Sequence, residues 1–407
     1  MREDSSVRLK TMWRFLAPLA FLGLFSSVLQ AGTHLILPFF NLSKDASVEW
    51  VGESLAETIH DALSGSGVLV LSRSDREEAF RRLRIRPYTP LTRASVLKLG
   101  QALDAGTVVY GTYQLDASAA PEAEKTNRTI RITARILDLE HMKLGPEYGE
   151  SGSLSDLAQL QNRLAWETLR FVRPKSAPSQ EVFKRQNPPA RVDAIENYIR
   201  GLLATDVDQQ HRFFTQAARL DGTFFKPYYP LGKLQWAREN YGVAAGWLAK
   251  VPEEDRHYRE ANFLLGLCRY FLGDYESAER AFSLVLQTVP LNEVYNNLGA
   301  TLSQQGRFPA ALTNFRKALD GDSTDPDYHF NIGYVLWKEG NFSEAAESFR
   351  AVLERDSEDS EAKTMLSRCL KASGPRPGDP NGDLERLKED FNETVYLQLI
   401  EALGPKS

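Results

Sequence analysis

The side chains best suited to acid–base or metal chemistry in this sequence are six scattered histidines. They form no His-Glu-x-x-His pair, and no aspartate or cysteine cluster stands beside them at metal-ligand spacing. The two cysteines, Cys268 and Cys369, lie in apolar helical patterns, where a thiol packs as a small hydrophobic group. We therefore expect no metal centre and no disulfide framework. The histidines are His34, His60, His141, His211, His257 and His329.

Two further patterns could bind phosphate or a hard cation. The turn Gly65-Ser66-Gly67 lacks the Gly-Lys-Ser/Thr that completes a phosphate-binding loop, and glycine is expected anyway at a turn between a helix and a strand. The acidic groups at 253–255 and 354–359 fall between predicted helices, where solvated charge is the favoured interpretation. The sequence also lacks a Gly-x-Ser-x-Gly nucleophile motif. We predict a non-enzymatic protein without a cofactor.

Length and charge allow several domains and do not favour nucleic acid as a partner. The 407 residues suffice for two or three domains, each with its own core. The 49 basic and 54 acidic residues give a net charge of -5, so no global field attracts nucleic acid or an anionic membrane. A partner must therefore be sought on a local surface.

The first 31 residues have the architecture of a secretory signal. Arg8, Lys10 and Arg14 precede an apolar run over 15–29, and the small residue Ala31 follows it. The run is shorter than the roughly 20 residues that span a bilayer. We expect an exported protein, periplasmic or associated with the cell envelope. An uncleaved segment that anchors the chain in the inner membrane stays open as the alternative.

Residues 33–172 alternate strand and helix patterns, which predicts a small α/β domain. Apolar residues at intervals of three and four predict a helix over 48–63, and strict alternation predicts a strand over 129–139. The other expected elements are strands at 34–40, 68–71 and 107–115, and helices at 76–83, 93–103 and 154–171.

Three ordered segments of this domain resemble a known family. Residues 35–63 (LILPFFNLSKDASVEWVGESLAETIHDAL), 108–113 (VVYGTY) and 132–165 (ITARILDLEHMKLGPEYGESGSLSDLAQLQNRLA) look like the TolB amino-terminal-like domain, which is related to CsgG and FlgO. The resemblance implies an envelope or signalling module and no reaction. In that family the domain often precedes tetratricopeptide repeats.

After a Pro-rich connector at 173–191, expected to be a semi-rigid spacer, the chain repeats with a period of about 34 residues. Each periodic glycine lets two antiparallel helices approach closely, and the following aromatic is expected to fill the groove to the next pair. The segments LGLCRYFLGDYESAERAF, LGATLSQQGRFPAALTNF and IGYVLWKEGNFSEAAESF are similar to tetratricopeptide repeats. We predict an all-α superhelical solenoid over 192–371, with five repeats and a cap helix. The periodic positions include Gly232, Gly266, Gly299 and Gly333, and Phe282, Phe315 and Phe349.

The family pattern places aromatic and polar side chains on the inner side of the first helices and implies a concave groove for a partner peptide. Large aromatic area with a few orienting polar groups suits such a groove. The alternative is that several of these residues merely seal contacts between helices. A chaperone tail is disfavoured, because aromatics replace the Lys, Arg and Asn clamp, and an apolar or aromatic peptide is preferred. The expected groove residues are Tyr229, Lys233, Trp236, Phe263, Tyr270, Phe271, Asn296, Gln304, Phe330, Tyr334, Trp337 and Lys338.

The C-terminal residues predict a flexible link at 372–382 and then an amphipathic helix at 383–404. Proline and glycine in the link cannot continue a helix. The helix must bury its apolar stripe on its own solenoid, on a second copy or on a partner. The stripe consists of Leu384, Leu387, Phe391, Val395, Leu399 and Leu403.

Together these patterns predict a multidomain chain, a small α/β domain followed by a solenoid, that acts as a protein-binding scaffold in the bacterial cell envelope. The groove would hold a protein partner, and the α/β domain would supply a second contact surface. The alternative is a sensor whose α/β domain binds a small molecule and whose repeats relay the signal.

Overall fold

A computed structural model of the chain describes residues 32–43, 45–86, 89–116, 128–376, 384–392, 395, 396 and 399. The expected signal or anchor at 1–31 and the link residues 377–382 lie outside the described residues. Within the described part of the chain, no helix has both the length and the apolar character needed to cross a membrane. The chain divides into two units, and the second, residues 32–407, contains the described elements.

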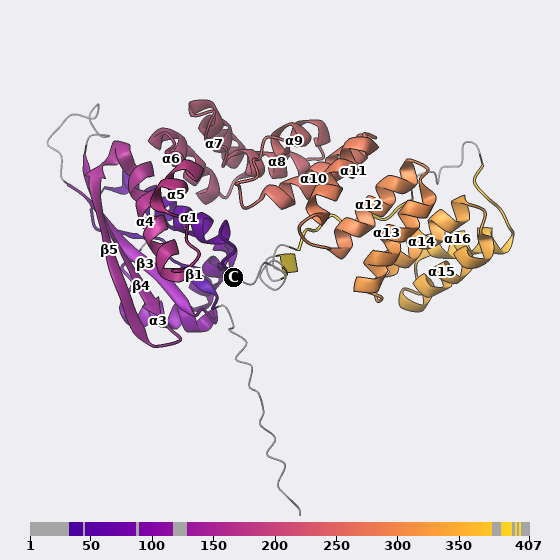
Figure 1. The fold of residues 1–407 in the computed structure, drawn as a ribbon, viewed down its shortest axis with the longest axis horizontal. Coiled ribbons are helices and arrows are strands. Elements are labelled where there is room, and N and C mark those ends of the chain that lie inside the picture. The colour runs from indigo at the N-terminus through magenta and orange to yellow at the C-terminus, as the bar shows by residue number, and fades with distance from the viewer. Residues whose placement is uncertain are drawn as a thin grey trace, which may run out of the picture. The chain divides into compact units, whose positions relative to one another are not determined.

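A mixed sheet organises the first part of the chain, as the indigo and magenta arrows of Figure 1 show. Strand β3 (Thr107–Leu115) pairs in parallel with β1 (His34–Ile36) and β2 (Phe40–Asn41) and antiparallel with β4 (Thr129–Asp138). The strand expected at 34–40 is therefore interrupted at 37–39. The strand expected at 68–71 is reduced to a single bridge between His34 and Val70.

Strand β5 (Lys143–Ser153) was not expected from the sequence. It pairs antiparallel with β4 and forms the edge of the sheet. Its residues, KLGPEYGESGS, are mostly exposed and do not alternate between apolar and polar types. Main-chain hydrogen bonds to β4 hold this strand, so side-chain periodicity gives no signal for it.

Helices cover both faces of the sheet. Helices α1 (Trp50–Ser64) and α4 (Leu157–Val172) pack on one face, and α2 (Arg73–Arg82) and α3 (Arg93–Ala102) pack on the other. Alternation along β3 separates the two layers, since Val109 and Tyr113 belong to the first core and Val108 and Tyr110 to the second. The predicted α/β class is confirmed.

The connector at 173–191 is packed and partly helical, which corrects the expectation of a spacer. It contains α5 (Gln180–Gln186), whose Phe183 is buried. The indole of Trp166 on α4 donates to the carbonyl oxygen of Pro178 (2.9 Å). The composition suggested an open linker because proline and serine flank an apolar residue that finds a place in the core.

Residues 192–370, all described, form consecutive helix pairs and a last helix, which Figure 1 shows from α6 onward. This confirms the predicted all-α part of the fold. The helices are α6 (Val192–Leu203), α7 (Val207–Leu220), α8 (Tyr228–Trp236), α9 (Tyr241–Leu248), α10 (Tyr258–Phe271), α11 (Tyr275–Leu286), α12 (Asn292–Gln304), α13 (Phe308–Gly321), α14 (Pro326–Lys338), α15 (Phe342–Arg355) and α16 (Ser360–Leu370).

The periodic glycine and aromatic of one repeat pack against each other. A Cβ atom on Gly266 would lie 2.6 Å from Cε1 of Phe282, and one on Gly299 would lie 2.8 Å from Cδ1 of Phe315. The aromatic therefore fills the space between the two helices of its own pair, and the expectation that it fills the groove to the next pair is wrong.

The C-terminal residues depart from the predicted helix. Residues 384–390 have no helical structure, and helical residues are described only from Val395 onward, after Asn392, whose Oδ1 accepts from the Val395 amide (3.0 Å). The apolar residues Leu384, Leu387 and Phe391 still pack against the core of the repeats. The expected helix over 383–404 is therefore wrong for 384–390, because the main chain there binds repeat side chains instead. We call residues 384–392 the tail segment.

Candidate functional site

Asparagines on α12 and α14 hold the main chain of the tail segment. The Nδ2 atom of Asn331 donates to the carbonyl oxygen of Arg386 (2.8 Å), and its Oδ1 accepts from the Arg386 amide (2.7 Å). Asn297 pairs with Lys388 in the same way, at 2.7 and 2.8 Å. Asn296 donates to the Arg386 carbonyl as well (2.8 Å). These side chains act as a strand would in a β-ladder, and the groups they bind exist in every peptide.

Asn297 and Asn331 occupy equivalent positions of successive repeats, each two residues before the periodic glycine. Both are completely buried. Asparagine is unfavourable inside a helix, because its amide competes with the main chain for hydrogen bonds. Its recurrence at one repeat position is the signal that sequence reasoning missed.

The side chain of Glu385 fills a polar pocket between α12 and α14. Its Oε1 accepts from the Ser303 hydroxyl (2.6 Å) and the Lys338 ammonium (2.7 Å), and its Oε2 accepts from the Gln304 amide (2.6 Å). The Glu385 side chain is fully buried. The pocket thus satisfies a carboxylate on both oxygens.

The guanidinium of Arg386 lies over the ring of Phe330, 3.7 Å from its centre. It also reaches Asp327 (3.2 Å), Asp359 (2.7 Å) and Glu361 (3.0 Å). Burial disfavours the charged form of Asp359, but the hydrogen bonds from Arg386 and from the main chain, together with the charge of Arg386, outweigh burial and hold the pKa of Asp359 below its usual value. The site therefore combines a flat aromatic surface with carboxylates, which suits the planar, forked arginine head.

Two more contacts complete the binding of the tail segment. The ammonium of Lys388 lies 2.7 Å from Asp325 and 2.6 Å from Asp327. Further along, the ring of Phe391 packs against Phe263, with 5.5 Å between ring centres. The tail segment thus crosses α16, α14, α12 and α10, and we call this surface the tail-binding face.

Among the described contacts, the tail-binding face brings together part of the expected groove set. Phe263, Asn296, Gln304, Phe330 and Lys338 contact the tail segment. The indole of Trp337 donates to the carbonyl oxygen of Ser373 (2.7 Å). The expected preference for an apolar or aromatic occupant does not describe this segment, because amides and charges make most of its contacts.

The other expected groove residues lie in contacts within and between repeats. Tyr229 stacks on His257, with 4.1 Å between ring centres, and Lys233 pairs with Glu260 at 3.1 Å. Tyr334 is fully buried and stacks on Trp337. Trp236 and Phe271 cluster with Tyr241, and Tyr270 packs edge-on against Tyr275. Tyr334 and Trp337 belong to the core of the array, which corrects their expected place on an open surface.

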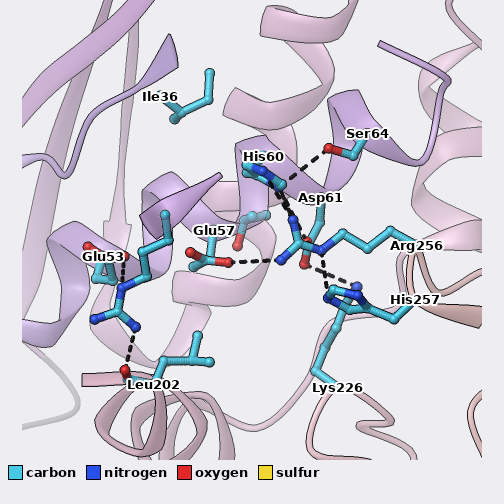
Figure 2. Close-up of polar contacts among 12 residues, drawn as sticks. Ile36, Glu53, Glu57, His60, Asp61, Ser64, Leu202, Lys226, Arg256 and His257 are labelled. Carbon is cyan, nitrogen blue, oxygen red and sulfur yellow. Dashed lines mark hydrogen bonds and ion pairs between the residues drawn. The ribbon is translucent and has the colours of Figure 1, made fainter. Parts of the chain in front are cut away.

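A second polar cluster joins α1 to the repeats, and Figure 2 shows Arg256 between the acidic residues of that helix. Arg256 lies 3.1 Å from Asp61 and 3.7 Å from Glu57, and its guanidinium contacts His60. Lys226 lies 3.1 Å from Asp61. We call this cluster the joint. Beside the joint, the first helix pair shares a hydrophobic core with the sheet.

Burial governs the protonation of the joint. Burial raises the pKa of Glu57, although the positive charge of Arg256 acts to lower it. Burial also disfavours the charged form of Asp61, but Lys226 and Arg256 outweigh it and hold its pKa well below the ordinary value. For His60, burial and then the charge of Arg256 lower the pKa to about 4. The histidine is therefore neutral near pH 7.

Comparison with known proteins identifies the repeats. Residues 229–293 and 296–370 match the tetratricopeptide repeat family. No curated protein matches the chain. Among solved structures, YrrB, described as a TPR protein with an unusual peptide-binding site, is 23% identical over 39% of this chain and 84% of that one, with a TM-score of 0.34.

Two further solved structures show the same range of similarity. MamA from Desulfovibrio magneticus RS-1 is 23% identical over 40% of this chain and 92% of that one, with a TM-score of 0.36. The APC/C hetero-tetramer Cut9-Hcn1 is 19% identical over 53% of this chain and 41% of that one, with a TM-score of 0.35. The family match alone shows that residues 229–293 and 296–370 carry tetratricopeptide repeats.

Proposed function

We propose that this chain is a non-enzymatic scaffold that holds an extended peptide segment of a partner protein on the tail-binding face. The observation that carries the proposal is the paired hydrogen bonding of Asn297 and Asn331 with main-chain N–H and C=O groups. Because every extended peptide offers these groups, the face can accept a segment from another protein in place of the tail segment.

The proposal includes a place in the cell and a role for the α/β domain. The N-terminal residues 1–31 support export, with the chain either periplasmic or anchored in the inner membrane of the envelope. The resemblance of 33–172 to the TolB amino-terminal-like domain supports a second contact surface. The shared core fixes that domain to the first helix pair, and the joint fixes it to the residues that precede α8 and α10, so both surfaces would act together.

A tail-released chain tests the binding of peptides. This is the full chain with Glu385→Lys, Arg386→Glu and Phe391→Ala in its own tail, and the probe is a fluorescein-labelled synthetic peptide of residues 383–399. We expect saturable binding by fluorescence anisotropy. Asn297→Ala with Asn331→Ala should weaken it by about 30-fold, because main-chain groups lose their partners. Asn314→Ala on α13 is the matched control, since Asn314 bonds only within its own helix among the described contacts. Peptide binding that is unchanged by Asn297→Ala with Asn331→Ala would contradict the proposal.

One observation favours a second candidate function, the sensing of a small polar molecule. A pocket lies where α1, α4 and α6 meet, and Ser54, Asp61, Gln161 and Lys226 are among the residues that line it. The Ser54 hydroxyl donates to Gln161 (2.9 Å) in its wall. A ligand there should raise the melting temperature of the full chain, and Gln161→Leu should abolish that rise. A panel of polar metabolites that gives no shift would reject this candidate.

A further inference from the structure

Resting on the proposed function, we propose that the tail-binding face selects partner segments with a defined charge pattern, and that the tail segment competes for the face as an internal ligand. The pattern is a carboxylate residue followed directly by arginine, with a basic residue two positions after the arginine and an aromatic residue five positions after it. In the tail segment these are Glu385, Arg386, Lys388 and Phe391.

The first position requires a carboxylate. Glu385 is enclosed, and Ser303, Gln304 and Lys338 all direct hydrogen-bond donors at it. An apolar residue would leave the Lys338 ammonium without its partner, and a basic residue would place two cations together. The pocket therefore discriminates by charge as well as by shape.

The second position favours arginine over lysine. Its partners, Asp327, Asp359 and Glu361, surround a head group that also lies flat on Phe330. A guanidinium can stack and donate to several carboxylates at once, whereas an ammonium is a compact point charge.

The spacing of the remaining positions follows from the asparagines. Asn331 and Asn297 bind the main chain at Arg386 and Lys388, which sets the register of the segment. In this register Lys388 meets Asp325 and Asp327, and Phe391 meets Phe263. If the segment shifted by one residue, an acidic side chain would lie at one of the acidic sites that now bind Arg386 and Lys388. The charge pattern therefore favours the same register as the hydrogen bonds to the main chain.

Competition follows from covalent attachment. A ligand joined to its own site by a short connection acts at an effective concentration on the order of 1 mM. A partner must therefore match the pattern well enough to displace the tail segment, and generic peptides are excluded from the intact chain. The tail segment thereby sets a threshold for binding.

The test measures binding of the labelled peptide of residues 383–399 and its variants to the tail-released chain and to the unaltered chain. We expect Glu385→Lys or Arg386→Glu in the peptide to weaken binding by about 30-fold, and Glu389→Gln to change it by less than about 3-fold. Lys338→Glu in the tail-released chain should restore binding of the Glu385→Lys peptide to within about 5-fold of the natural pair. The unaltered chain should bind the natural peptide at least about 10-fold more weakly than the tail-released chain does.

The outcomes separate this inference from the proposed function. If every peptide variant binds alike, the face holds peptides without the charge pattern, and the inference is overturned while the function stands. If no peptide binds the tail-released chain, the proposed function fails as well. Light scattering provides a further test: a concentration-dependent dimer of the unaltered chain that is lost in the tail-released chain would overturn the inference in favour of tail exchange between copies.

Discussion

The joint and the tail-binding face use the same types of charged side chain in opposite ways. At the joint, Arg256 reaches carboxylates that are little exposed, with Glu57 at 8% and Asp61 at 18%. At the tail-binding face, Arg386 belongs to an extended segment and pairs in part with Glu361, which is 53% exposed. The joint consists of contacts between side chains. At the tail-binding face, by contrast, asparagine side chains form hydrogen bonds with the main chain of the tail segment.

This difference separates a permanent contact from an exchangeable one. A buried carboxylate that loses its cation is left without hydration, so the joint cannot open without a large loss of stability. The tail-binding face also holds a buried carboxylate, Glu385, but that carboxylate leaves with the tail segment, so water can then reach both Glu385 and the repeat side chains that bound it. The fold can therefore survive the departure of the tail, which is what a site for a competing partner requires.

The largest expected effect is at the joint. Arg256→Ala leaves the buried Glu57 without its paired cation and Asp61 with Lys226 alone, and should lower the free energy of unfolding by about 4 kcal/mol. Urea denaturation followed by circular dichroism measures this change. Arg238→Ala is the matched control, because Arg238 pairs with the exposed Asp208, and it should cost less than about 1 kcal/mol. Equal effects of the two substitutions would show that the joint is an ordinary surface contact.

The joint also illustrates why sequence reasoning reached the fold but only part of the site. Glycine and aromatic periodicity records packing within one repeat, as between Gly266 and Phe282, so it predicts helix pairs directly. The contact of Glu57 with Arg256 joins residues far apart in sequence, and no local pattern encodes it.

The tail segment was misjudged for a related reason. Its apolar spacing fits a helix, and Leu384, Leu387 and Phe391 do bury their side chains. However, Asn297 and Asn331 bind its main chain, and the free energy of those hydrogen bonds depends on residues outside the segment. A local propensity cannot report such a competing partner.

As the pH falls, the joint should lose stability at a higher pH than the tail-binding face does. His60 has a pKa of about 4 in the folded chain against 6.5 for the ordinary side chain, so the unfolded chain binds the proton more readily. The stabilisation is complete above pH 6.5, declines as the pH falls toward 4, and amounts to about 3 kcal/mol in total. Chemical denaturation at several pH values measures it, and His60→Gln should remove this part of the slope. Burial also lowers the pKa of His34 to about 4, so the pH dependence of stability that His34 contributes should remain in the His60→Gln variant.

Tail docking should stay constant over most of that range, because the pKa of Asp359 lies below its usual value and those of Arg386 and Lys388 lie above theirs. Hydrogen exchange of the tail segment, corrected for the intrinsic rate, should therefore stay constant between pH 6.5 and 5. Faster exchange at the lower pH would show that docking of the tail segment depends on pH as the joint does.

A smaller effect on stability is expected from the asparagines. Asn297→Ala with Asn331→Ala in the full chain should weaken docking of the tail segment by about 2 kcal/mol, since buried main-chain groups lose their partners. Hydrogen exchange should accelerate at the amides of Arg386 and Lys388, which donate to these side chains. The melting temperature should fall by less than about 3 °C. Cooperative loss of the repeats in this variant would mean that the tail segment is a structural part of the array.

The smallest expected effect is a difference in salt dependence between the joint and the tail-binding face. Raising the salt concentration from about 0.1 M to about 1 M shortens the Debye length from about 10 Å to about 3 Å, which screens exposed charges far more than buried ones. The pairs of Arg386 with Glu361 and of Lys388 with Asp327 are partly exposed, so the labelled peptide should bind the tail-released chain about 3-fold more weakly at high salt. The loss of stability caused by Arg256→Ala should change little, because Glu57 lies in the interior. If peptide binding is as insensitive to salt as the joint, hydrogen bonds to the main chain supply the affinity and the charges act only in selecting the segment.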